Sequence, residues 1–184
     1  VDVLATRAEV WIALGEPERA ELDLTALIDR GEKLAPAYGR RAALRAAAGR
    51  VRSARADWAM AFDIGPTPER ALEWGKLSEE LGDHAVAMDG YRHALRVLDG
   101  PVVLRLALMR LERERGDLGN ALREVDALLR VRPEHALWHL TRAELLMEIG
   151  RPMMAASSCD QARFLAKRAF EVRATAQRQN TVER

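Results

Sequence analysis

Two histidines, His135 and His139, have the spacing most suggestive of chemistry in this chain. Residues four apart share one face of a helix, and such a pair can supply two ligands to a metal ion. A metal site needs a third ligand, whereas His84 and His93 belong to a different part of the chain and no cysteine pair exists. We therefore expect a structural or surface role for both histidines and no metal.

Other reactive side chains in the sequence are scattered. Cys159 is the only cysteine, so no disulfide can form within the chain, which fits cytosol and periplasm equally. We expect it to be a small buried hydrophobic residue rather than a nucleophile. The sequence contains no glycine-rich phosphate loop, no nucleophile elbow and no cluster of acid, base and nucleophile. These features predict a protein that is not an enzyme and needs no cofactor.

The densest basic stretch lies between residues 40 and 55, before the first acid at Asp57. Such a stretch can dock an acidic partner. Few aromatic residues are interleaved with it, and its alanines are typical of closely packed helix, so we expect a solvated arginine face and no nucleic-acid binding. The net charge of the whole chain is only +1. The cluster consists of Arg40, Arg41, Arg45, Arg50, Arg52 and Arg55.

A glycine that recurs along the chain indicates which helices carry the residues described above. Its copies are 34, 33, 34 and 34 residues apart, and each is followed five residues later by an alanine. A unit of this length with a central glycine predicts two short helices joined by a tight turn, which bury their apolar faces against neighbouring units. The glycines are Gly15, Gly49, Gly82, Gly116 and Gly150, and the alanines are Ala20, Ala54, Ala87, Ala121 and Ala155.

The residues after these glycines agree with a helix start. Pro17 and Pro152 each lie two residues after a glycine, where the fixed φ of proline suits a first helical turn. Asp83 and Asp117 follow their glycines directly and can accept from unpaired N–H groups. We expect one domain over 1–184, with repeats at about 1–34, 35–67, 68–101, 102–135 and 136–169 and a C-terminal cap or tail at 170–184.

The pattern resembles the tetratricopeptide repeat family over essentially the whole chain. The segments that carry the resemblance run from Leu14 to Ala20, Gly49 to Pro66, Leu81 to Ala94, Gly116 to Pro133 and Ile149 to Ala162. The resemblance implies an all-α fold: a right-handed superhelix, or α-solenoid, of about five hairpins plus a C-terminal capping helix. Members of the family typically hold a peptide in a concave groove, which implies a non-enzymatic scaffold or adaptor that binds a protein partner.

The resemblance also indicates which side chains would line the groove. Inward positions of the first helices hold Leu72, Leu106 and Leu140, three leucines 34 residues apart. Replacing Leu106 and Leu140 by glutamate should abolish binding without loss of helicity. The remaining residues expected beside these leucines or along the same helices are Val103, Leu137, Met147, Lys76, Arg110, Arg113 and Glu144.

Alternatives to a peptide groove remain open. The same leucines could line a closed apolar pocket for a lipid or sterol, of roughly 300–1,000 Å³, and the end faces of a repeat array could stack on another copy. Recognition of a chaperone's acidic tail is not expected, because the relevant inner positions hold Glu9, Ala43 and Glu144 in place of an amide. No apolar run approaches the roughly 18 residues of a membrane span. Arginine greatly outnumbers lysine, which favours a bacterial source.

Overall fold

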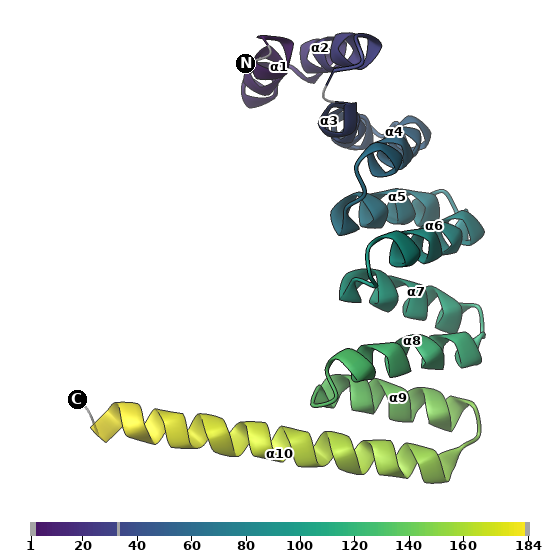
Figure 1. The fold of residues 1–184 in the computed structure, drawn as a ribbon, viewed down its shortest axis with the longest axis vertical. Helices are drawn as coiled ribbons and strands as arrows, with labels where there is room; N and C mark the ends of the chain where they lie inside the picture. The colour runs from purple at the N-terminus through teal and green to yellow at the C-terminus, as the bar shows by residue number, and fades with distance from the viewer. Residues whose placement is uncertain (1–2, 33, 183–184) are drawn as a thin grey trace. The chain divides into compact units, whose positions relative to one another are not determined.

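A computed structural model describes residues 3–32 and 34–182, and from residue 172 onward it describes the backbone alone. All regular elements in this part of the chain are helices, which confirms the all-α class. They form successive hairpins (Figure 1). The helices are α1 (Val3–Ala13), α2 (Pro17–Asp29), α3 (Leu34–Ala47), α4 (Val51–Ile64), α5 (Pro68–Glu80), α6 (His84–Val97), α7 (Val102–Glu114), α8 (Leu118–Val131), α9 (Ala136–Glu148) and α10 (Pro152–Val182).

Each predicted glycine lies in the turn between the two helices of a hairpin. The five residues have φ values between 71° and 81°, a left-handed conformation that costs side-chain-bearing residues free energy. The residue after each glycine donates its N–H to a carbonyl five residues earlier, as Asp83 does to Ser78 at 2.8 Å and Asp117 to Glu112 at 2.8 Å. This is the Schellman pattern of a helix C-terminus. The sequence therefore predicted the positions of these turns, and the structure adds the left-handed conformation that requires glycine there.

The alanines after the turns lie where the helices approach closely. All five lie on the second helix of their hairpin and are between 0% and 1% exposed. A close approach of the same kind occurs at Gly75 of α5, where an added Cβ would lie 2.2 Å from the ring of Tyr91 on α6. Small residues at these points let neighbouring helices pack with little space between them.

The chain forms two compact units, residues 1–107 and 108–184, and the boundary falls within α7. In the first unit, Ala8, Leu24 and Leu27 of the first hairpin pack with Ala37 of α3 in one buried cluster. Helix α4 in turn packs on α5. In the second unit, Ala143 and Leu146 of α9 pack with Ala155 of α10.

Helix α10 is much longer than the other helices, with 31 residues. We expected the fifth repeat to end near residue 169 and a C-terminal cap or tail to follow at 170–184. In the structure α10 continues without a break from the fifth hairpin to Val182 and extends beyond α9 (Figure 1), while residues 183–184 lie outside the described part. The physical reason is that neither glycine nor proline occurs between residues 153 and 182, so nothing ends the helix. No helix in the described residues is both long enough and apolar enough to cross a bilayer.

Candidate functional site

The residues predicted to line the groove lie on the first helices of the third, fourth and fifth hairpins. Leu72 and Lys76 are on α5, Val103 and Leu106 on the first half of α7, and all four belong to the first unit. The second unit carries Arg110 and Arg113 on the rest of α7, and Leu137, Leu140, Glu144 and Met147 on α9.

Exposure of the predicted apolar residues is greatest on α9. Leu137 is 62% exposed, Met147 59% and Leu140 42%. In the first unit, Val103 is 39% exposed, whereas Leu72 and Leu106 are half-buried. Among the predicted apolar residues, those of α9 are therefore the most accessible to solvent.

The charged residues among the predictions are paired within their own units. Arg113 lies 3.5 Å from Glu144 and also pairs with Glu148, one turn further along α9. The hydrogen bond with Glu148 raises the pKa of Arg113 above its ordinary value. Arg110 pairs with Glu114 at 3.0 Å, and Lys76 with Glu73 at 2.7 Å. Of the predicted charges, the structure thus brings Arg113 and Glu144 together.

A mostly apolar hollow of about 440 Å³ lies between α9 and α10. Leu137 and Leu140 line it, together with Cys159, which sequence analysis expected to be buried but which is only half-buried. The repeat period did not point to α10 as a wall of this hollow. The other lining residues are Ala136, Ala162, Arg163 and Ala166. We call this surface the α9–α10 hollow.

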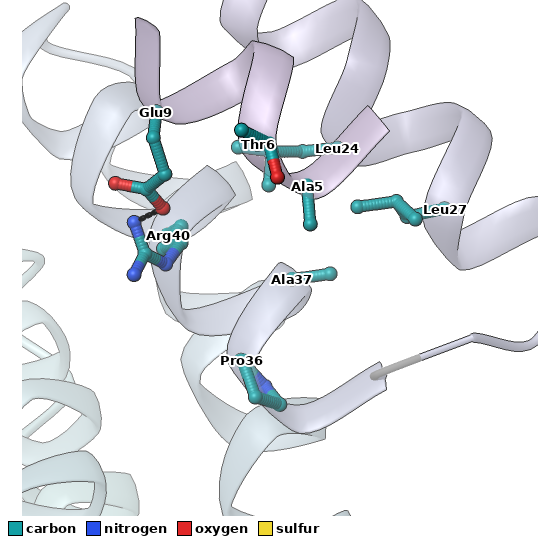
Figure 2. A pocket seen from close by; sticks show the side chains of 8 residues that line it. All are labelled: Ala5, Thr6, Glu9, Leu24, Leu27, Pro36, Ala37 and Arg40. Atoms are coloured by element: carbon teal, nitrogen blue, oxygen red, sulfur yellow. Dashed lines mark ion pairs between the residues drawn. The ribbon is translucent and has the colours of Figure 1, made fainter. Parts of the chain in front are cut away.

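A second hollow, of about 330 Å³, lies in the first unit where α1, α2 and α3 meet (Figure 2). Leu24 and Leu27 form its apolar floor, and Glu9 of α1 pairs with Arg40 of α3 across one side. The repeat pattern did not predict this hollow. The small size of Ala5 and Ala37, which lie opposite the two leucines, is the feature of the sequence that could have indicated it.

The basic cluster of residues 40–55 is an ion-pair network rather than the solvated face expected from the sequence. Arg41 donates from Nε and Nη2 to Asp57 at 2.9 and 2.8 Å, and from Nη1 to Thr25 at 3.1 Å. Arg45 donates to Asp57 and to Glu21, both at 2.8 Å. The Arg41 and Arg45 side chains are only 11% and 21% exposed. Three further arginines of the cluster pair with acids of neighbouring hairpins: Arg40 with Glu9, Arg50 with Glu21 and Arg55 with Asp83.

The central pair of this network recurs at a fixed distance from the turn glycine. Positions eight residues before and eight after Gly15 hold Arg7 and Asp23, which form two hydrogen bonds of 2.7 and 2.6 Å. The same positions around Gly49 hold Arg41 and Asp57. Residues of different hairpins that lie at the same distance from their turn glycine therefore occupy equivalent places.

The two histidines stabilise the start of α9. Nδ1 of His135 accepts from the backbone N–H of Trp138 at 3.4 Å, and the two rings stack with centroids 4.0 Å apart. Nε2 of His139 lies 2.7 Å from the carbonyl oxygen of Pro133, to which it must donate. Within the described residues, no group of three potential ligands could hold a metal ion.

Solved structures with the same arrangement of hairpins are known. The protein MamA matches with a TM-score of 0.71 at 9% identity, over 92% of this chain and 93% of that one. YrrB, a TPR protein with an unusual peptide-binding site, matches with a TM-score of 0.63 at 17% identity, over 91% and 90%. A tetratricopeptide repeat protein from Parabacteroides merdae matches with a TM-score of 0.55 at 21% identity, over 88% and 63%.

No protein-family model matches the chain, and no curated protein matches its sequence. Identities this low establish a shared fold and leave the ligand undefined.

Proposed function

We propose that this chain, which has the tetratricopeptide-repeat fold, is a non-enzymatic scaffold that binds a segment of a partner protein through the exposed face of α9. The observation that carries the proposal is the exposure of Leu137, Leu140 and Met147 on one helix, at 62%, 42% and 59%. Large apolar side chains exposed together mark interaction sites more often than single ones do. The solved neighbours include a TPR protein with a peptide-binding site, which agrees with this class of function.

In this proposal the apolar side chains supply affinity and the charged residues supply orientation. A few buried anchors carry most of the binding free energy of an interface. Arg110, Arg113 and Glu144 already have partners within the second unit, so they meet a ligand as neutralised pairs rather than as single charges. Neutralised pairs favour an apolar or weakly charged partner segment. Leu72, Lys76, Val103 and Leu106 belong to the first unit, and their contact with a partner is a separate prediction from the sequence.

Met147 gives the sharpest test of this site, because it is 59% exposed and does not line the α9–α10 hollow. In a Met147→Glu variant, a charge replaces an anchor, and we expect at least roughly a tenfold loss of partner binding. Affinity purification with quantitative mass spectrometry would measure the loss against the unchanged chain.

Val131→Glu is the matched control, since Val131 is 66% exposed but lies on α8, outside the predicted site. The control should retain every partner that the unchanged chain recovers. Equal recovery with Met147→Glu and the unchanged chain would remove α9 as the binding face.

The carrier of an apolar small molecule remains the second hypothesis. The apolar walls of the α9–α10 hollow favour it, although that hollow is open to solvent and would leave part of a lipid or sterol uncovered. Native mass spectrometry followed by organic extraction decides between the two. A lipid bound at near-stoichiometric amounts would support the carrier function over the scaffold function. A chain that is free of lipid would support protein binding instead.

A further inference from the structure

The α9–α10 hollow corresponds to the smaller hollow of the first hairpin, which α3 closes on one side. Counted from the turn glycines, Cys159 and Ala162 are equivalent to Leu24 and Leu27. Those leucines are each 1% exposed, because Ala37 of the next hairpin's first helix packs on them. Around the hollow, by contrast, Cys159 is half-buried and Leu140 is 42% exposed. The hollow is therefore the place where the first helix of another hairpin would pack.

The segment that follows the hollow does not return to cover it. Helix α2 ends at Asp29, and the chain then turns so that α3 packs on α2. The residue of α10 equivalent to Asp29 is Phe164, but α10 continues straight to Val182. Phe170 is 74% exposed and continues the stripe of Cys159, Arg163 and Ala166 at helical spacing. The stripe, which is apolar except for Arg163, thus extends beyond the hollow itself.

Helix α1 has the matching face. On α3, Ala37 and Leu44 are the residues that pack on the cluster of α2. The equivalent residues of α1 are Val3 and Val10, which are 73% and 49% exposed. The sizes are complementary as well. The valine at position 3 stands where α3 has an alanine, and the hollow has a cysteine and an alanine where α2 has leucines.

The polar residues follow the same correspondence. Arg41 donates from Nη1 to Thr25 of the preceding hairpin at 3.1 Å. Arg7 is the equivalent of Arg41, and Asp160 is the equivalent of Thr25. The Asp160 side chain is 74% exposed and pairs with Arg163 of the same helix at 3.5 Å. Arg7 uses Nε and Nη2 for Asp23, so its Nη1 has the position from which Arg41 reaches Thr25. An α1 helix in the hollow would place opposite charges at this point.

The overall charge of the two ends favours the same pairing. Residues 1–40 contain eight acidic and five basic side chains, whereas residues 160–184 contain three acidic and six basic ones. Contact between two copies of the basic end would bring like charges together, and contact between unlike ends would not. From these observations we infer that the α9–α10 hollow binds α1 of a second copy of the chain. The contact is heterologous, so a joined pair retains one unused surface of each kind.

Two single substitutions test this contact in the 184-residue chain. Ala166→Glu places a charge in the hollow, and Val10→Glu places one on α1. Both residues are exposed, so folding should persist, which circular dichroism would confirm. Sedimentation velocity over a range of concentrations should show association of the unchanged chain, weakened at least roughly tenfold by either substitution.

A mixture of the two variants distinguishes this contact from a symmetric one. The intact α1 of the Ala166→Glu chain can occupy the intact hollow of the Val10→Glu chain, so the mixture should form a one-to-one pair and grow no further. Cys159 is the only cysteine of each chain, and its reaction with a maleimide should slow in the Val10→Glu chain, whose hollow is occupied, and not in the Ala166→Glu chain. Leu137 and Leu140 belong both to the hollow and to the proposed partner site, whereas Met147 belongs to the partner site alone. Met147→Glu should therefore associate with other copies like the unchanged chain, so that a loss of partner binding in this variant is distinct from a loss of self-association.

Two results would overturn the inference. One is an unchanged chain that remains monomeric up to the highest concentration at which it stays in solution. The other is a Val10→Glu variant that associates by itself as strongly as the unchanged chain, because that would show a contact that does not need this face of α1.

Discussion

At the scale of single residues, acids with little exposure each hold two arginines. Asp57 is 4% exposed and accepts hydrogen bonds from both Arg41 and Arg45. Glu21 accepts from Arg45 and also pairs with Arg50. Removing one member of such a set leaves the others partly buried without a charge partner, which costs more than the pair itself contributes.

Asp57→Asn should therefore destabilise the fold by roughly 1.5–3 kcal/mol, since two arginines lose their carboxylate. Urea unfolding followed by circular dichroism would give the change in the free energy of unfolding. Asp89→Asn is the control, because the Asp89 side chain is 78% exposed and its pair with Arg92 should contribute less than about 1 kcal/mol. Equal effects of the two changes would contradict a structural role for the network.

The same acids predict how stability depends on pH. Hydrogen bonds from Arg7 hold the pKa of Asp23 below its ordinary value of 3.8. Burial opposes ionisation of Glu21, but its hydrogen bonds with Arg50 and Arg45 outweigh this and hold its pKa below 4.5. Because both pKa values are lowered by folding, the stabilisation is complete above the ordinary values and is lost as pH falls through the lowered ones.

We expect the free energy of unfolding of the unchanged chain to fall below about pH 4, and Asp23→Asn should reduce that slope. Unfolding titrations at several pH values would measure both. A slope that is the same in the variant would show that Asp23 does not contribute to the pH dependence.

At the scale of elements, two kinds of glycine have opposite roles. Gly116 ends its helix with φ of 78°, and no atom lies within 4 Å of an added Cβ, so conformation rather than space requires glycine there. Gly119 lies inside α8, where an added Cβ would make only an ordinary contact with Asp117 at 3.9 Å. Glycine within a helix is less favourable than alanine.

Gly116→Ala should destabilise the fold by about 1–2 kcal/mol, the cost of a left-handed alanine. Gly119→Ala should instead stabilise it by about 0.4–1 kcal/mol, because the unfolded chain loses conformational freedom. Thermal unfolding of the two variants measures this difference. Shifts of the same sign would contradict the roles assigned to the two glycines.

At the scale of the whole molecule, the sequence predicted the hairpins well because their cause is local. A left-handed turn residue and a small contact residue recur every 33 or 34 positions, and both leave a clear trace in one chain. The site was harder to predict because its determinants are not local. The partners of Arg40 and Arg50 come from the preceding hairpin, and the exposure of Leu140 compared with Leu106 depends on what packs beside each helix.

The length of α10 is a second feature that the repeat period alone could not predict. The period suggested a boundary near residue 169, but the absence of a glycine or proline lets the helix continue, and the period alone does not report that. The α9–α10 hollow follows from this continuation, since α2, which ends at Asp29, is covered by α3. Counting residues from the turn glycines shows which residues of the first hairpin are equivalent to those of the hollow. The exposed fractions of the side chains, which come from the structure, show that another helix covers them in the first hairpin and not at α10.

The central claim, that the exposed face of α9 binds a partner protein, is tested most directly by photo-crosslinking in cells from a photoreactive residue at position 147. A second chain with the same residue at position 131 of α8 serves as the comparison. The proposal predicts a discrete crosslinked protein from position 147 that is absent from position 131. Identical crosslinks from both positions, or crosslinks from position 131 alone, would contradict it.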